Sequence, residues 1–370
     1  MAEPLKNIYK PDFFEALIPH IQKVMPAFDK QAFLQAIFDQ EWPMKELRER
    51  MRHIAICLDQ YLEGDYAQKC QYITEIFHEI GRGRTGEEEY GFEYMFFPDF
   101  IQVFGLEEYD TSINTIEEIT KYSSCEFAIR PFIQKHPEKM MDQMLEWSTH
   151  PHSMVRRLSS EGCRPRLPWG MGLPFLKKEP APILPILEQL KNDTSETVRR
   201  SVANNLNDIS KDHPDLIISL AKSWQGQSSE TDWIIKHACR GLLKQGHPEV
   251  MQLFGFGSIE KIHIDNFKVL TPVVRIGDAL EFFFDLNNND EKALKLRLEY
   301  GLYYLKANGS LSRKVFMISE KEYAPGSTTP IHRKQSFKVI TTRKFYPGMH
   351  EVSVIINGQE VEKGEFELTV

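Results

Sequence analysis

A fifteen-residue stretch from Val155 to Trp169 holds more chemically active side chains than the packing of a helix and a loop requires. It contains four arginines, a glutamate that directly precedes a glycine, and a tryptophan that follows two prolines. Because Gly162 is a typical residue at a helix C-terminus, Glu161 is expected in the last helical turn, where the helix dipole disfavours a carboxylate by about 0.3–1 kcal/mol. Such a local conflict is typical of functional sites. A solvated glutamate paired with Arg157 or Arg164 would fit the same pattern, so the stretch alone leaves both interpretations open.

Three further side chains are candidates for the same site, and each also has a structural interpretation. Glu126 follows Ser123-Ser124-Cys125 in a capping-box pattern, so it could cap its own helix. Asp208 follows several asparagines, which are weak helix formers, so it could belong to a fraying helix end. Trp169 could anchor its loop in the core. The co-occurrence of three carboxylates with a tryptophan and neighbouring arginines favours a functional site.

The elements that must position these residues form a repeat. Second helices are expected to open at Val155-Arg156-Arg157, Val198-Arg199-Arg200 and Ile235-Lys236-His237, at intervals of 43 and 37 residues. His-Pro-acid triplets at residues 136–138, 213–215 and 247–249 mark other helix starts, because proline fits the first helical turn and the acid complements the dipole. A two-helix repeat of about 40 residues is the signature of HEAT or armadillo solenoids, whose second helices line a concave face.

Equivalent positions in successive repeats would place the basic pairs in a row along one surface. Such a row suits a regularly spaced polyanion, whereas cations that merely keep the protein soluble would not need to recur at one structural position. The cations expected to contact a polyanion are Arg130, Arg156, Arg157, Arg164, Arg166, Arg199, Arg200, Lys236, His237 and Arg240.

A change of character at residues 255–257, Gly-Phe-Gly, divides the sequence into two predicted domains. Residues 1–257 show apolar residues at helical spacing, whereas residues 258–370 predict short strands with hairpin turns at Asn308-Gly309 and Asn357-Gly358. We therefore predict a multidomain protein, an all-α HEAT-like repeat solenoid followed by an all-β immunoglobulin-like sandwich. The predicted strands are Leu280–Leu286, Leu294–Leu305, Lys314–Ile318, Phe337–Thr341, His350–Ile356 and Phe366–Val370.

The charge of the chain is unevenly distributed. The net charge of −8 comes from residues 1–125, which carry 12 Lys and Arg against 23 Asp and Glu, while residues 126–257 carry 17 against 15. A partner with phosphates can therefore still bind the middle of the chain. Five cysteines without Cys-x-x-Cys spacing indicate a reducing compartment and no metal site. The absence of a transmembrane run and of a signal-peptide core predicts a soluble protein of the cytoplasm.

A second basic region lies in the predicted sandwich. Between Ala324 and His350 the chain has no Asp or Glu. This concentration of cations predicts a second contact with a polyanion, although lysine-rich edge strands also serve to prevent aggregation between sheets. The cations of this region are Arg333, Lys334, Lys338, Arg343 and Lys344.

Three segments carry a resemblance to a known family. They are residues 124–132 (SCEFAIRPF), residues 155–169 (VRRLSSEGCRPRLPW) and residues 198–208 (VRRSVANNLND). Together they resemble the AlkC branch of the AlkC/AlkD DNA glycosylases. The resemblance covers roughly residues 10–255 and is tightest in 124–250, and some members of that branch end in an immunoglobulin-like domain.

The resemblance implies an enzyme that excises cationic alkylated bases, such as 3-methyladenine or 3-methylcytosine, from double-stranded DNA by breaking the N-glycosidic bond. It implies that Glu126, Glu161, Asp208 and Trp169 are the site residues, and that Arg157 and Arg164 hold the DNA backbone beside the lesion. No lysine nucleophile, cofactor or metal is required, so a monofunctional hydrolase is expected. We expect it to be a monomer in the bacterial cytoplasm that associates with the nucleoid when it is bound to DNA.

One alternative from another functional class remains open. Helical solenoids are more often protein-binding scaffolds than enzymes, and the acidic N-terminal third could serve such a role. A scaffold, however, would not need Glu161, Trp169 and Asp208 together.

Overall fold

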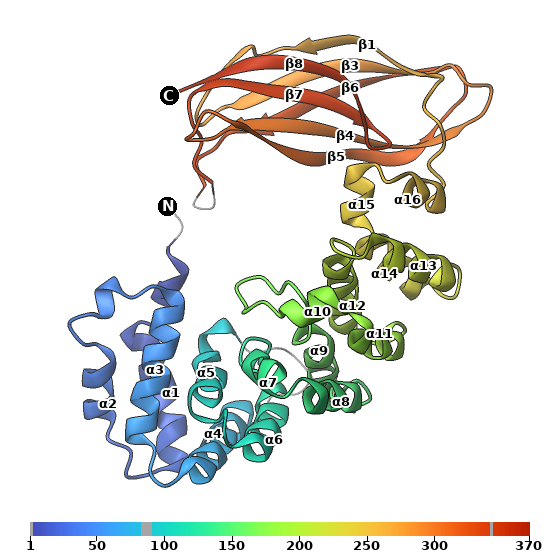
Figure 1. The fold of residues 1–370 in the computed structure, drawn as a ribbon. Coiled ribbons are helices and arrows are strands. Elements are labelled where there is room, and N and C mark those ends of the chain that lie inside the picture. The colour runs from blue at the N-terminus through green and yellow to red at the C-terminus, as the bar shows by residue number, and fades with distance from the viewer. Residues whose placement is uncertain (1–2, 83–90, 341–342) are drawn as a thin grey trace. The chain divides into compact units, whose positions relative to one another are not determined.

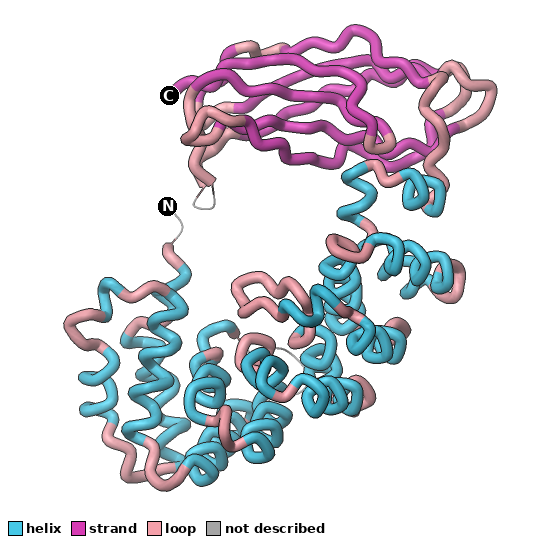
Figure 2. The backbone as a smooth tube through the Cα atoms, in the orientation of Figure 1, coloured by secondary structure: helices cyan, strands magenta, loops and turns pink. Residues whose placement is uncertain are grey.

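The computed structural model describes residues 3–82, 91–340 and 343–370. Contacts between residues divide the chain into two compact units, of which the first comprises residues 1–213 and 224–238 and the second comprises residues 214–223 and 239–370. Among these described residues, strands occur only in the second unit (Figure 2). The predicted fold class, helices followed by an immunoglobulin-like arrangement of strands, is confirmed.

The first unit is built of helices that pack on one another along the chain (Figure 1). Helix α8 packs on α9 and α11 packs on α12, and the second helices α9, α12 and α14 also pack on one another in that order. This is the stacking that the two-helix repeat predicts. The helices of this unit are α1 (Pro11–Val24), α2 (Lys30–Ile37), α3 (Leu47–Tyr61), α4 (Tyr66–Gly81), α5 (Phe96–Phe104), α6 (Tyr109–Thr120), α7 (Arg130–Lys135), α8 (Pro137–Trp147), α9 (Ser153–Glu161), α10 (Pro174–Lys178), α11 (Leu184–Leu190), α12 (Glu196–Ile209) and α14 (Ser229–Ala238).

The predicted helix starts are mostly confirmed. Pro137 opens α8, Pro214 opens α13 (Pro214–Trp224) and Pro248 opens α16 (Pro248–Leu253). Each proline occupies the first turn, where its missing N–H group has no helical partner to lose.

One part of the repeat prediction is wrong. Lys236 and His237 lie in the last turn of α14 and do not open it. The helix begins earlier because Ser228 and Thr231 exchange hydrogen bonds between backbone N–H groups and side-chain oxygens, at 3.0 and 3.1 Å, which fixes the helix start at Ser229. The arginine pairs of α9 and α12 are therefore equivalent to each other, and the basic pair of α14 is not equivalent to them.

The second unit is built on two sheets, one with the strand order β1-β3-β6 and one with the order β2-β8-β7-β4-β5. Alternate residues of β3 point inward, so that Leu280, Phe282, Phe284 and Leu286 are buried between the sheets. The strands are β1 (Ile262–Val269), β2 (Val273–Arg275), β3 (Ala279–Asn288), β4 (Leu294–Leu305), β5 (Leu311–Tyr323), β6 (Ser327–Ser336), β7 (Gly348–Ile356) and β8 (Gln359–Thr369).

Both predicted hairpin turns are present, and one predicted strand is wrong. Gly309 joins β4 to β5 with a φ of 78°, and Asn357 and Gly358 join β7 to β8 with φ values of 45° and 78°. The strand predicted at Phe337–Thr341 is absent as far as Ile340, and Thr341 lies outside the described residues. The strand instead precedes Phe337 as β6, an edge strand whose polar residues and Pro330 conceal it from hydrophobic patterning.

The short helices α15 (Arg240–Gln245) and α16 belong to the second unit, although they precede the predicted boundary at residue 257. Lys295 donates a hydrogen bond to the carbonyl of Phe254 at 3.0 Å, and Asn357 donates one to the carbonyl of Gly257 at 3.0 Å. These bonds attach the segment after α16 to the strands. Division into domains 1–257 and 258–370 therefore stays a prediction. No helix in the described residues is long and apolar enough to cross a membrane.

Candidate active site

The helix α9 ends as predicted at Glu161. Glycine is needed at position 162 for close packing, however, and not for a left-handed backbone. Gly162 has an ordinary helical φ of −63°. A Cβ atom there would lie 2.7 Å from a methyl group of Ile129 and 3.0 Å from the carbonyl oxygen of Leu158. Glycine therefore allows the end of α9 to approach the residue that precedes α7, which brings Glu161 close to the segment that carries Glu126.

The centre of the site is Arg164, which lies between two buried carboxylates. Its Nη1 atom is 2.6 Å from Oε1 of Glu161, and its Nε atom is 2.9 Å from Oδ2 of Asp208. The three residues are 6%, 6% and 1% exposed, in the order Glu161, Arg164, Asp208. Lys211, one turn beyond Asp208, binds Oδ1 of that carboxylate at 2.9 Å. Sequence reasoning missed Lys211, although its spacing of three residues from Asp208 is typical of a helical ion pair.

Burial lowers the pKa of the Arg164 guanidinium, but the charges of Glu161 and Asp208 outweigh burial and raise it above its ordinary value. Arg164 therefore stays charged between the two acids. A buried ion network of this kind is costly to break, because removal of one partner leaves an unpaired charge and typically costs about 3–5 kcal/mol.

Buried polar side chains of α12 fix Glu161 and the end of α9 through hydrogen bonds. Ser201 donates a hydrogen bond to Oε2 of Glu161 at 2.7 Å and accepts one from Ser160 at 2.6 Å. Asn205 donates to the carbonyl of Ser160 at 2.8 Å. The serines and the asparagine are at most 2% exposed. The Glu161 carboxylate is thus fixed from two sides, and the prediction did not include Ser201 or Asn205.

Glu126 and Asp208 do not have the structural roles that the sequence left open. Glu126 does not cap α7, because the residue before that helix is Ile129 and no side chain caps it. Its Oε2 atom instead lies 3.6 Å from Nη1 of Arg157, which also donates to Ser124 at 2.8 Å. Asp208 lies within α12 and is held by two cations, so it is not part of a fraying end.

Trp169 is not a core anchor, because its side chain is 66% exposed. Its backbone has a φ of 62°, a left-handed conformation that costs a residue other than glycine about 1–3 kcal/mol. The carbonyl of Trp169 accepts a hydrogen bond from Arg48 of α3, and the indole meets the ring of Phe92 edge-on at 6.3 Å between ring centres. The loop therefore presents an aromatic face to solvent at a local conformational cost.

Arg130 was expected to contact a polyanion, but the structure gives it another role. Its side chain is fully buried, and it donates hydrogen bonds to the carbonyls of Gly162 at 2.8 Å, Arg164 at 2.9 Å and Met171. Burial lowers its pKa to about 10. The predicted contact of Arg130 with a polyanion is contradicted, because its guanidinium is enclosed by the loop that it holds.

The first arginine of each repeat pair also has a structural role. Arg156 donates to the carbonyls of His150 and Pro151, and Arg199 donates in the same way to those of Asp193 and Thr194. Each guanidinium thus fixes, through hydrogen bonds, the loop that precedes its own helix. Arg156 also forms two bonds to the Asp193 carboxylate, at 2.6 and 3.0 Å.

The remaining predicted cations are more accessible. The side chains of Arg166 and Arg200 are 37% and 60% exposed, and each pairs with an acid that is itself partly exposed, Asp212 and Glu196. Lys236 is exposed on α14, and His237 stacks on Trp233 with ring centres 5.1 Å apart. Arg240 opens α15 in the second unit.

Comparisons with known proteins find relatives of both parts of the chain. A model described as "DNA alkylation repair enzyme" matches residues 102–242, and one described as "Uncharacterised protein YhaZ, C-terminal Ig-like domain" matches residues 263–370. The chain is 41% identical over 364 residues to YhaZ of Bacillus subtilis (strain 168), covering 98% of this chain and 99% of that protein.

A solved structure covers the whole chain. It is the alkylpurine DNA glycosylase AlkC of Pseudomonas fluorescens bound to DNA that contains an abasic site analog, with 32% identity, a TM-score of 0.92 and complete coverage of both chains. Similarity of this extent includes the helical unit, the sandwich and the segments that carry the candidate site. The chain therefore belongs to the family of AlkC-type alkylpurine DNA glycosylases, in the form that ends in an immunoglobulin-like domain.

Proposed function

We propose that the protein is a DNA repair glycosylase that hydrolyses the N-glycosidic bond of cationic alkylated bases in double-stranded DNA, with 3-methyladenine and 3-methylcytosine as substrates. The observation that carries this proposal is the pair of buried carboxylates, Glu161 and Asp208, fixed around Arg164, with the exposed Trp169 five residues after Arg164 in the chain. This arrangement occurs in a chain with the AlkC fold.

The chemistry needs these groups because an alkylated base that is already cationic leaves readily. The barrier lies in the positive charge that develops on the sugar and in the delivery of water. Carboxylates fixed by Arg164, Lys211 and Ser201 need no reorganisation when that charge appears, which makes their field most effective. Glu126 is a third carboxylate in addition to Glu161 and Asp208. One of the three orients or deprotonates the attacking water.

Trp169 supplies the contact with the damaged base. An exposed indole can stack on a cationic base or on sugar C–H groups, and a cation–π contact is worth about 0.5–2 kcal/mol. Because the leaving base carries its own positive charge, this scheme requires neither a lysine nucleophile nor a cofactor.

The DNA backbone is gripped by the accessible cations of the first unit. Exposed ion pairs such as Arg166–Asp212 and Arg200–Glu196 contribute little to stability, so these arginines can exchange their carboxylates for phosphates at small cost. Arg157 is placed beside Glu126 and would contact the backbone nearest the lesion. Arg164 serves mainly to hold the two carboxylates, because both of the contacts described for its guanidinium are with them.

The sandwich supplies a second DNA contact. A cleft of about 460 Å³ lies between the β4–β5 hairpin and the residues before β7, and no acid is among the described residues that line it. Its cations are Lys306, Arg313, Lys314, Arg343 and Lys344. Two cations of the predicted basic region have local partners instead, since Lys334 pairs with Glu281 at 2.9 Å and Arg333 donates to the carbonyl of Ile318.

We also propose that the protein acts as a monomer in the bacterial cytoplasm, bound to the nucleoid. All five cysteines are buried and unbridged, which suits a reducing compartment.

The proposal is tested by incubating the purified protein with methylated double-stranded DNA and separating the released bases by chromatography. Release of free 3-methyladenine, with an abasic site left in the DNA, is the expected result. A folded protein that neither binds this DNA nor releases a base would favour the alternative of a protein-binding scaffold.

A further inference from the structure

We propose that Arg48 is a positioning residue that holds Trp169 in its exposed, left-handed conformation; this inference rests on the proposed function of the site. Arg48 lies on α3, in the acidic N-terminal third, and is separated from Trp169 by 121 residues. Its Nη1 atom donates a hydrogen bond to the carbonyl oxygen of Trp169.

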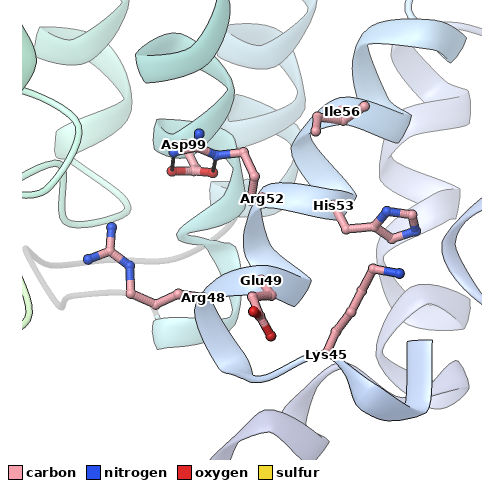
Figure 3. Close-up of a pocket in the computed structure, with 7 residues that line it drawn as sticks. All are labelled: Lys45, Arg48, Glu49, Arg52, His53, Ile56 and Asp99. Atoms are coloured by element: carbon pink, nitrogen blue, oxygen red, sulfur yellow. Dashed lines mark hydrogen bonds and ion pairs between the residues drawn. The ribbon is translucent and has the colours of Figure 1, made fainter. Parts of the chain in front are cut away.

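The orientation of Arg48 separates it from the other cations of its helix. A cavity of about 390 Å³ on α3 is lined by Arg48 together with Lys45, His53 and other residues, and Figure 3 shows that the Arg48 side chain extends away from Lys45 and His53. Arg52 is occupied by Asp99, with bonds of 2.6 and 3.0 Å. The partners of the Arg48 guanidinium, Trp169 and Phe127, are not among the residues that line this cavity.

Arg48 connects two parts of the candidate site. The centre of its guanidinium lies 5.1 Å from the ring centre of Phe127, the residue that follows Glu126. The Arg48 guanidinium thus lies over the ring of Phe127, next to Glu126 in the chain, and also binds the backbone of Trp169. A planar guanidinium can keep its face on the ring while its edge donates the hydrogen bond, a geometry that an ammonium group does not reproduce.

The turn that contains Trp169 holds only part of its conformation. The N–H group of Gly170 donates a hydrogen bond to the carbonyl of Leu167 at 3.2 Å, but a residue other than glycine at the third position of such a turn is unfavourable, so a further restraint is needed. Arg130 holds the loop at the carbonyls of Gly162, Arg164 and Met171, which lie on either side of Trp169 in the chain. The carbonyl of Trp169 itself is bound by Arg48. A left-handed backbone at an exposed residue persists only where contacts from the surroundings determine it.

Fluorescence tests the position of the indole without DNA. Trp42, Trp147 and Trp224 are at most 7% exposed, whereas Trp169 and Trp233 are 66% and 40% exposed. In a Trp233→Phe background, quenching by acrylamide therefore reports mainly on Trp169. Arg48→Ala should change the quenching constant by roughly 1.5-fold or more, because exposure of the indole is no longer fixed by the backbone contact. An unchanged constant would overturn the proposal.

A double-mutant cycle tests whether Arg48 acts through Trp169. Arg48→Ala should lower single-turnover excision of 3-methyladenine by roughly fivefold in the native background, and by less than about twofold when Trp169→Ala is already present. Equal losses in both backgrounds would show that Arg48 acts independently, as a phosphate contact does, and would contradict the proposal. Arg48→Lys should recover only part of the rate, because lysine keeps a donor but loses the stacking on Phe127.

Arg52→Ala is the matched control, since Arg52 lies one turn further along α3 and pairs with Asp99. It should lower thermal stability and leave the quenching of Trp169 unchanged. If Arg52→Ala alters the quenching as much as Arg48→Ala does, a general loosening of α3 explains both results and the proposal fails. If the wild-type protein releases no base, the proposed function fails, while the quenching experiment still decides the role of Arg48.

Discussion

At the scale of single residues, the candidate site is a set of charges whose positions are fixed by neighbours. Asp208 binds both Arg164 and Lys211, and Glu161 binds both Arg164 and Ser201. Each acid is held through both of its oxygens. Such carboxylates act best as fixed anions beside developing positive charge.

The hydrogen bond from Ser201 to Glu161 gives a first prediction. Ser201→Ala should lower single-turnover excision by roughly three- to tenfold, because Glu161 loses the donor that fixes Oε2. Ser201→Thr, which keeps the hydroxyl group, is the matched control and should retain most of the rate. Equal rates for the alanine variant and the wild type would show that this bond does not support the reaction.

Arg130 gives a second prediction, which concerns stability. Arg130→Ala should lower the free energy of unfolding by about 2–4 kcal/mol, because three loop carbonyls lose a buried donor. Thermal denaturation measures the change, with Arg200→Ala as a surface control that should be nearly neutral. A stable Arg130→Ala protein with weakened DNA binding would restore the original expectation of a DNA contact.

At the scale of elements, α9 and α12 repeat both their packing and their arginine pair. In each pair the first arginine binds carbonyls of the preceding connection, and the second pairs with an acid, Glu126 for Arg157 and Glu196 for Arg200. Adjacent residues of one sequence motif therefore have different roles. Only the second member is expected to contribute to the DNA interface.

The third prediction separates the two roles. Arg200→Ala should weaken binding to damaged and undamaged duplexes alike and reduce the salt dependence of the affinity by about one phosphate contact, as Arg157→Ala should. Arg199→Ala should instead lower stability by about 1–2 kcal/mol and leave the salt dependence unchanged. Affinity measured over a salt series distinguishes the two, and an altered slope for Arg199→Ala alone would reverse the assignment.

The repeat explains which contacts the sequence could predict. The bonds Glu161–Ser201 and Arg164–Asp208 join residues 40 and 44 positions apart, close to the repeat interval of 43 residues. Residues one repeat apart face each other when second helices stack, so these pairs were predictable in principle. The contact from Arg48 to Trp169 spans 121 residues and several helices, and no local pattern marks it. Burial of Arg130 was equally hidden, because a motif rich in arginine looks the same whether a guanidinium faces solvent or a loop.

At the scale of the whole molecule, the chain combines a helical unit with a sandwich, as its family does, and the sandwich has its own basic cleft. The residues before Gly257 are bonded to the strands, so removal of the sandwich would also disturb α15 and α16. Substitutions in the cleft are therefore a better test of its role than truncation.

The fourth prediction concerns this cleft. Combined replacement of Arg343 and Lys344 by alanine should weaken DNA binding and reduce the salt slope by about two phosphate contacts. Replacement of Lys334, which pairs with Glu281, is the control and should change the slope little. A double variant with wild-type affinity and slope would mean that the cleft does not contact DNA.

The most direct test of the central claim is the single-turnover excision rate of 3-methyladenine by Asp208→Asn. The substitution removes a buried negative charge and keeps the shape of the side chain, so the rate should fall at least about tenfold while DNA affinity stays within about threefold of the wild type. Asp212→Asn, a nearby acid that pairs with Arg166 on the surface, should keep the wild-type rate. Excision by Asp208→Asn at the wild-type rate would contradict the assignment of the carboxylates to the chemical step.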